Sequence, residues 1–170
     1  DYSELELSSL RNIIGYVTQE PVVFNDTIAN NISFWECDSQ EDVCNKRIKD
    51  AAILANCDRF INECEMGYDT IIGDKGVKLS GGQCQRIAIA RELFKEPEIM
   101  IFDEATSSLD TESEQLIQQS INSLKGERTI LIIAHRLSTI RNCDYIYVLK
   151  DGSIVEEGSF DELYGNMDSR

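Results

Sequence analysis

Long apolar segments are absent from this sequence, and proline and histidine are rare. No purely apolar run is longer than that of Ile130–Ala134, whereas a membrane-spanning helix needs about 20 apolar residues. The N-terminal residues Asp1–Glu4 have neither the basic head nor the apolar stretch of a signal peptide. Two prolines and ten glycines in a varied sequence of 170 residues argue against a fibrous or disordered chain. With 42% hydrophobic and 28% charged residues, we expect a globular protein with a proper core.

Basic clusters are also missing. The chain has 16 Lys and Arg against 31 Asp and Glu, a formal net charge of −15. Proteins that bind nucleic acid hold the phosphate backbone with grouped Lys and Arg, and no such group occurs here. We therefore expect no nucleic-acid partner, and most of the acidic residues are expected on a solvated surface.

The cysteines lack the spacing of a metal site. None of the six forms a C-x-x-C pair, which makes a structural zinc site an unfavourable interpretation. A disulfide framework is not expected either, because the chain is not small and shows no secretory signal. The sequence predicts reduced thiols in a cytosolic protein for all of them: Cys37, Cys44, Cys57, Cys64, Cys84 and Cys143.

Strand and helix patterns alternate along the chain. A short helix is predicted to end at Ile32, with Asp26 or Thr27 as its cap, and a second helix to run from a cap at Ser39 to about Ala55. Two further helices are predicted over Gln83–Lys95 and Glu112–Leu124. Strands are predicted at Ile13–Val17, Ile99–Phe102, Thr129–Ile133 and Tyr145–Leu149, the middle two buried, with a tight turn at Asp151-Gly152 leading into Ser153–Val155. This order predicts an α/β fold whose mainly parallel sheet has right-handed crossovers. The helical middle would be an insertion beside that sheet.

Two acids follow one of the predicted buried strands. Asp103 and Glu104 come directly after Ile99–Phe102, at the end of a strand where α/β sheets bind ligands. One carboxylate can hold Mg²⁺ directly or through water, and its neighbour can polarise an attacking water. The alternative is a pair of surface acids in a turn.

Two further features point to phosphate. Leu79–Gln83 opens a helix with two glycines and Ser80, so backbone N–H groups and a helix N-terminus can face an anion. His135, the single histidine, ends the strand Ile130–Ala134 and is expected on the same sheet edge as Asp103 and Glu104. Taken alone, the first could be an ordinary glycine loop and the second a structural histidine.

Together these residues resemble the nucleotide-binding domains of ABC transporters. Leu79–Gln83 matches the signature motif of that family letter for letter, and Ile99–Glu104 resembles its Walker B strand. Ser107–Asp110 resembles the D-loop, Ala134–Arg136 the switch-histidine loop and Tyr16–Pro21 the Q-loop. The stretch Phe24–Ile32 resembles the exporter branch, whose nucleotide-binding domain is usually fused behind a membrane domain.

The resemblance implies a P-loop NTPase core and a role for each matching residue. Residues 1–24 would be a core segment ending in the Q-loop, 25–97 the α-helical subdomain with the signature, and 98–170 a second core segment. Asp103 and Gln19 would contact Mg²⁺, Glu104 would be the general base and His135 would bind the γ-phosphate of ATP. Ser80, Gly81, Gly82 and Gln83 would grip ATP on a second nucleotide-binding domain, and Asp110 would communicate across that interface. The implied location is the cytoplasmic face of a membrane, with a transmembrane domain as partner.

One part of the family pattern is absent. The phosphate loop G-x-x-x-x-G-K-[ST] does not occur in these 170 residues. The expectation is therefore that the chain is the C-terminal part of an exporter ATPase, inactive alone and active within its parent. Smaller departures are Gly73–Gly76, where exporters usually have Gly-Glu-Arg-Gly, and Cys84, which stands where a basic residue is usual.

Two alternatives remain open. An ATPase head of a chromosome-maintenance or repair protein shares these motifs, but the flanking heptads that mark it are absent and the acidic balance disfavours DNA. A non-catalytic interaction module would not need Glu104, His135 and the signature together.

Overall fold

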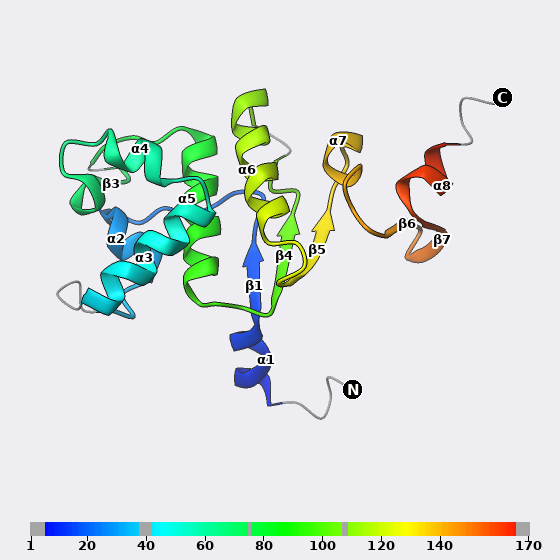
Figure 1. The fold of residues 1–170 in the computed structure, drawn as a ribbon, viewed down its shortest axis with the longest axis horizontal. Coiled ribbons are helices and arrows are strands. Elements are labelled where there is room, and N and C mark those ends of the chain that lie inside the picture. The colour runs from blue at the N-terminus through cyan, green and yellow to red at the C-terminus, as the bar shows by residue number, and fades with distance from the viewer. Residues whose placement is uncertain (1–5, 38–41, 75, 107–108, 166–170) are drawn as a thin grey trace. The chain divides into compact units, whose positions relative to one another are not determined.

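The computed structural model describes residues 6–37, 42–74, 76–106 and 109–165 (Figure 1). The chain divides into two compact units, one formed by residues 1–133 and the other by residues 134–170. The predicted helix cap at Ser39 and the first two D-loop residues, Ser107 and Ser108, lie outside the described residues.

The first unit is built on a three-stranded parallel sheet in the order β1-β4-β5. In Figure 1 the three strands lie side by side, and their bounds are Ile14–Val17 for β1, Ile99–Asp103 for β4 and Thr129–Ile133 for β5. The register pairs Val17 with Phe102, and Asp103 with Ile133. Because all three strands run the same way, their carboxyl ends meet at one edge, as the sequence predicts.

The two faces of this sheet are unequally covered. Met100 and Phe102 of β4 are fully buried, whereas the alternate residues of the strand are half-buried. In β5, Leu131 is 52% exposed and Ile133 is 45% exposed. The prediction that both apolar strands are buried on both faces is therefore wrong, because helices pack on one face only within the described part of this unit. Helix α5 (Gly81–Phe94) lies against β1 on the covered face, where a Cβ on Gly15 would meet Glu92.

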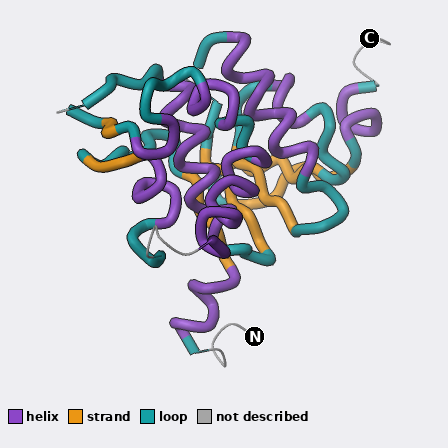
Figure 2. The backbone as a smooth tube through the Cα atoms, turned by 60° about the vertical axis from the view of Figure 1, so that its left-hand side comes forward, coloured by secondary structure: helices purple, strands orange, loops and turns teal. Residues whose placement is uncertain are grey.

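Helices α2, α3 and α6 pack against α5, whereas α1 contacts β1 (Figures 1 and 2). Helix α1 precedes β1, and α6 connects β4 to β5. The described residues between β1 and α5 include helices α2, α3 and α4, a 3₁₀ turn and the small antiparallel pair β2-β3. The bounds are Leu7–Ile13 (α1), Ile28–Ser33 (α2), Asp42–Leu54 (α3), Asp58–Asn62 (α4), Gly67–Asp69 (the 3₁₀ turn), Thr111–Ser123 (α6), Asp26–Thr27 (β2) and Ile71–Ile72 (β3). The β3 strand falls in a stretch that reads as loop in the sequence.

Helix starts agree closely with the capping residues in the sequence. The Thr27 side chain accepts a hydrogen bond from the Asn30 amide and caps α2, one of the two predicted options. Helix α5 begins two residues earlier than predicted, at Gly81, because Ser80 is its cap.

The second unit contains α7 (Leu137–Ile140), the antiparallel hairpin β6-β7 (Ile146–Lys150 and Ser153–Gly158) and α8 (Phe160–Tyr164). The predicted tight turn is confirmed, with left-handed backbone at both Asp151 and Gly152. Within the second unit β6 is hydrogen-bonded to β7, and the prediction that the strand near Tyr145–Leu149 joins the parallel sheet stays a prediction. A two-residue turn brings the next strand back as an antiparallel partner.

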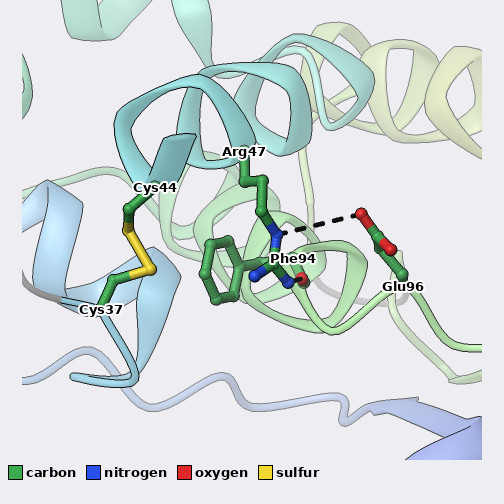
Figure 3. The surroundings of a disulfide bond; sticks show 5 residues. All are labelled: Cys37, Cys44, Arg47, Phe94 and Glu96. Carbon is green, nitrogen blue, oxygen red and sulfur yellow. Dashed lines mark hydrogen bonds and ion pairs between the residues drawn. A yellow bond between two sulfur atoms is a disulfide. The ribbon is translucent and has the colours of Figure 1, made fainter. Parts of the chain in front are cut away.

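A disulfide joins Cys37 to Cys44 (Figure 3), with a Cα–Cα separation of 6.0 Å. This contradicts the prediction that all six cysteines are reduced; Cys57, Cys64, Cys84 and Cys143 are not disulfide-bonded. Chain length and the missing secretory signal could not predict this bridge. It forms because the segment after α2 lies close enough to the first turn of α3 for a disulfide. Among the described residues, no helix is long and apolar enough to span a membrane.

Arg91 ties α5 to the segment around α2. Its guanidinium donates to the carbonyl oxygen of Asn31 at 2.7 Å, to that of Val22 at 3.0 Å and to the side-chain oxygen of Asn31 at 3.2 Å. The same group lies over the rings of Phe24 and Phe34. Burial lowers the pKa of Arg91, and the hydrogen bonds and aromatic faces compensate for the loss of water around its charge.

We expect Arg91→Met to lower the free energy of unfolding by about 3 kcal/mol, because it leaves buried carbonyl oxygens without a charged donor. Urea unfolding measures the change. The control is Arg59→Met, since Arg59 forms an exposed ion pair with Glu63 and its loss should cost less than about 0.5 kcal/mol. Equal effects for the two variants would contradict the structural role given to Arg91.

We expect Cys37→Ser to destabilise the oxidised protein by about 2–3 kcal/mol, since the bridge closes a loop between residues seven apart in sequence. Adding dithiothreitol should destabilise the unmutated protein by the same amount and leave the variant unchanged. Thiol titration of the unreduced, denatured protein should find four reactive thiols; six would show that the bridge does not form.

Candidate functional site

The carboxyl ends of β1, β4 and β5 bring the predicted metal residues to one sheet edge. Asp103 is the last residue of β4, and Glu104 follows it. Strand β1 is the neighbour of β4, and Gln19 lies two residues after the end of β1. The end of β1 that leads to Gln19 therefore lies at the same sheet edge as Asp103 and Glu104.

Glu104 has an unusual backbone conformation. Its φ is 49°, in the left-handed region that residues other than glycine rarely adopt. Its N–H donates to the carbonyl oxygen of Ile133 on β5 at 2.9 Å, which fixes this turn to the neighbouring strand. Strained backbone of this kind persists only where the surroundings hold it, and it occurs often at functional sites.

Asp103 has a partner that the sequence analysis did not identify. The hydroxyl of Tyr16 on β1 donates to Asp103 Oδ2 at 2.6 Å. This hydrogen bond to the carboxylate is the main cause that raises the pKa of Tyr16. The register pairs Tyr16 with Ile101, so Tyr16 stands diagonal to Asp103, and the sequence alone does not give this register.

Helix α5 holds the start of the Q-loop. The Gln85 side-chain amide donates to the carbonyl oxygen of Thr18 at 2.9 Å, and Gln85 is buried. Glu92 accepts a hydrogen bond from the backbone N–H of Tyr16 at 3.3 Å. The segment just before Gln19 is thus attached to the signature helix at two points, and Gln19 itself is exposed.

The signature residues form the N-terminus of α5. Ser80 caps the helix: its hydroxyl accepts from the Gln83 N–H at 3.2 Å, and the Gln83 side chain accepts from the Ser80 N–H at 2.8 Å. The first-turn N–H groups of Gly81 and Gly82 have no acceptor within the helix. Because Ser80 and Gly81 are exposed, this end of the helix can present N–H groups to an anion.

The signature packs directly on the helix that Asp110 begins. Gly82 is buried, and a Cβ there would fall on the Oγ and Cβ of Ser113. The Asp110 carboxylate accepts from the Ser113 N–H at 3.0 Å, and this hydrogen bond is the main cause that lowers the pKa of Asp110. The structure therefore brings the signature and Asp110 together, an arrangement that spacing in the sequence does not reveal.

His135 and Cys84 are two further residues that the sequence analysis singled out. His135 is exposed and belongs to the second unit, two residues after β5, so its convergence with Glu104 stays a prediction. Cys84, which replaces a basic residue in the signature helix, is partly buried, and burial raises the pKa of its thiol. It therefore adds no charge to this end of α5.

The donors at the sheet edge suit Mg²⁺. Carboxylate and amide oxygens are the ligands that Mg²⁺ prefers, and it commonly takes only one or two from protein while phosphates and water complete the shell. In the described ranges no group of three or more His, Cys, Asp or Glu side chains is arranged to hold a metal ion. The residues present therefore fit a Mg²⁺ that would take part of its shell from phosphates and water.

Comparisons with known proteins show the family to which the chain belongs. The family model described as "ABC transporter" matches residues 1–107. ABC transporter B family member 1 of Dictyostelium discoideum is 48% identical over 99% of this chain and 18% of its own length. The ATP-dependent lipid A-core flippase of Salmonella typhimurium is 52% identical over 96% of this chain and 28% of its own length.

A solved structure has the same fold. It is a bacterial Atm1-family ABC exporter with ATP bound, with a TM-score of 0.83 and 43% identity over 98% of this chain and 28% of that one. The fold is that of a P-loop NTPase core with inserted helices, as the sequence predicts. The chain belongs to the ABC transporter family, and it spans less than a third of the length of these relatives.

We expect Gly82→Ala to destabilise the protein by about 1–3 kcal/mol, because the added methyl group overlaps Ser113 and forces α5 and α6 apart. The control is Gly81→Ala, one residue earlier in the same turn, where a Cβ would meet Leu109 Cδ2 at an ordinary 3.6 Å. Its unfolding free energy should stay within about 0.5 kcal/mol of the parent. Thermal unfolding compares the two, and equal values would contradict the described packing.

Proposed function

We propose that this chain is part of the ATP-hydrolysing motor of an ABC exporter. In the whole protein, ATP-driven pairing of two such domains would be coupled to export of a substrate across a membrane. Residues 25–97 would form the α-helical subdomain, between core segments 1–24 and 98–170. The domain would work at the cytoplasmic face of the membrane.

The observation that carries the proposal is the turn after β4. Asp103 and Glu104 are adjacent in sequence, yet the left-handed backbone at Glu104 changes the chain direction between them. One carboxylate is held by Tyr16, while the backbone of the other is fixed to β5. Two acids in such different surroundings suit two roles, one toward a metal and one toward water.

The chemistry would be transfer of the γ-phosphoryl group of ATP to water, with Mg²⁺ supplying charge neutralisation on the phosphates. Asp103 and Gln19 would hold the metal, Asp103 mostly through water. Glu104 would accept a proton from the attacking water, and His135 would donate a hydrogen bond to the γ-phosphate. Positioning and electrostatic stabilisation would provide most of the rate enhancement.

The proposed partners are a second nucleotide-binding domain and a transmembrane domain. Ser80, Gly81, Gly82 and Gln83 would contact ATP held by the second domain, because they form a helix N-terminus at which Ser80 and Gly81 are exposed. Asp110 would lie at the same interface, since its helix packs against Gly82. Gln19 would relay the state of the site to the membrane domain through the Q-loop that α5 anchors.

In the full-length protein we expect Glu104→Gln to lower the rate of ATP hydrolysis by at least 10²-fold while ATP binding is retained, because the amide cannot take the proton from water. Phosphate release and nucleotide binding are measured on the same preparation. The matched control is Glu98→Gln, an exposed glutamate at the opposite end of the same strand, which should keep normal turnover. A normal rate for Glu104→Gln would remove this residue from the role of base.

A further inference from the structure

The phenol of Tyr16 occupies an unusual place beside the proposed metal residue. Tyr16 stands opposite Ile101 in the parallel register, so its side chain lies on the face that also carries Asp103, two residues further along β4. The hydroxyl reaches Asp103 Oδ2 at 2.6 Å, the short distance of a hydrogen bond to a charged oxygen.

Packing does not explain a tyrosine at this position. Tyr16 is 46% exposed, while its neighbours Gly15 and Val17 are buried on the opposite face, toward α5. A side chain that is half in solvent contributes little to the core, and its polar atom is the part that makes a specific contact.

The backbone of Tyr16 is fixed on its other side. Its N–H donates to Glu92 Oε2, and Glu92 is in turn held by Lys95, with both carboxylate oxygens at 3.0 Å from Nζ. Two residues further on, Gln85 holds Thr18. The hydroxyl is therefore presented to Asp103 from a strand that α5 keeps in place.

We infer that Tyr16 is a positioning residue for the metal site: it holds one oxygen of the Asp103 carboxylate so that the other faces the nucleotide-bound Mg²⁺ and its waters. The inference rests on the proposed role of Asp103. A carboxylate held in one orientation loses less rotational freedom when the metal binds, so the phenol should strengthen metal binding without touching ATP.

The test uses Tyr16→Phe in the full-length protein, with Mn²⁺ as the probe of the metal site. Electron paramagnetic resonance of free Mn²⁺, in the presence of a non-hydrolysable ATP analogue, should show metal affinity weakened by about tenfold. Hydrolysis should show the same shift in the Mg²⁺ concentration that gives half the maximal rate, while the rate at saturating Mg²⁺ changes less than about threefold. Tyr147→Phe, which removes an exposed phenol from β6, should change neither.

Asp103→Asn separates this inference from the function on which it rests. If Asp103 is at the metal site, Asp103→Asn weakens Mn²⁺ binding strongly, and adding Tyr16→Phe to it has little further effect because the phenol acts through Asp103. An unchanged Mn²⁺ affinity in Asp103→Asn would overturn the proposed metal role itself. A weakened affinity in Asp103→Asn with none in Tyr16→Phe would overturn the inference alone.

A purely structural role for the Tyr16 phenol would give a different experimental result. In that case Tyr16→Phe would lower the melting temperature and the maximal rate at every Mg²⁺ concentration, and Mn²⁺ affinity would stay at the parent value. That result would also overturn the inference.

Discussion

The parallel pairing of β4 between β1 and β5 is the constraint on which the site depends. Because the three strands run in one direction, residues that are far apart in sequence meet at a common edge: the Q-loop follows β1, Asp103 ends β4 and Glu104 follows it. The pairing also fixes the turn at Glu104, whose N–H is bonded to the last residue of β5. Without β5 beside it, the left-handed backbone at Glu104 would have nothing to hold it.

Helix α5 connects this edge to the rest of the first unit. Its N-terminus carries the signature and packs on α6 through Gly82; its middle holds Thr18 through Gln85; its last turns hold Arg91 and Glu92 against neighbouring segments. At the end of the helix, Arg47 of α3 donates to the carbonyl oxygen of Phe94 at 2.9 Å and lies over its ring (Figure 3). A cation at this position also interacts favourably with the helix dipole. Helix α5 thus contacts several segments that lie far apart in the sequence.

Local patterns in the sequence predicted the elements well, whereas the contacts between elements were beyond them. The cap at Thr27, the turn at Asp151 and the strand before Asp103 are encoded by neighbouring residues, and each is present in the structure. The disulfide and the phenol bonded to Asp103 depend on which segments meet in space. The composition of an apolar strand such as β5 also does not show whether other elements cover both of its faces.

The unpaired edge of β5 has a consequence for how the sheet can be extended. Within the first unit, β5 is hydrogen-bonded to β4 on one side, and no described strand of that unit pairs with its other side. Leu131 and Ile133 leave apolar surface along the same strand. Such an edge is a template for a further strand, so the sheet of the first unit can grow at β5 by accepting a strand from outside that unit.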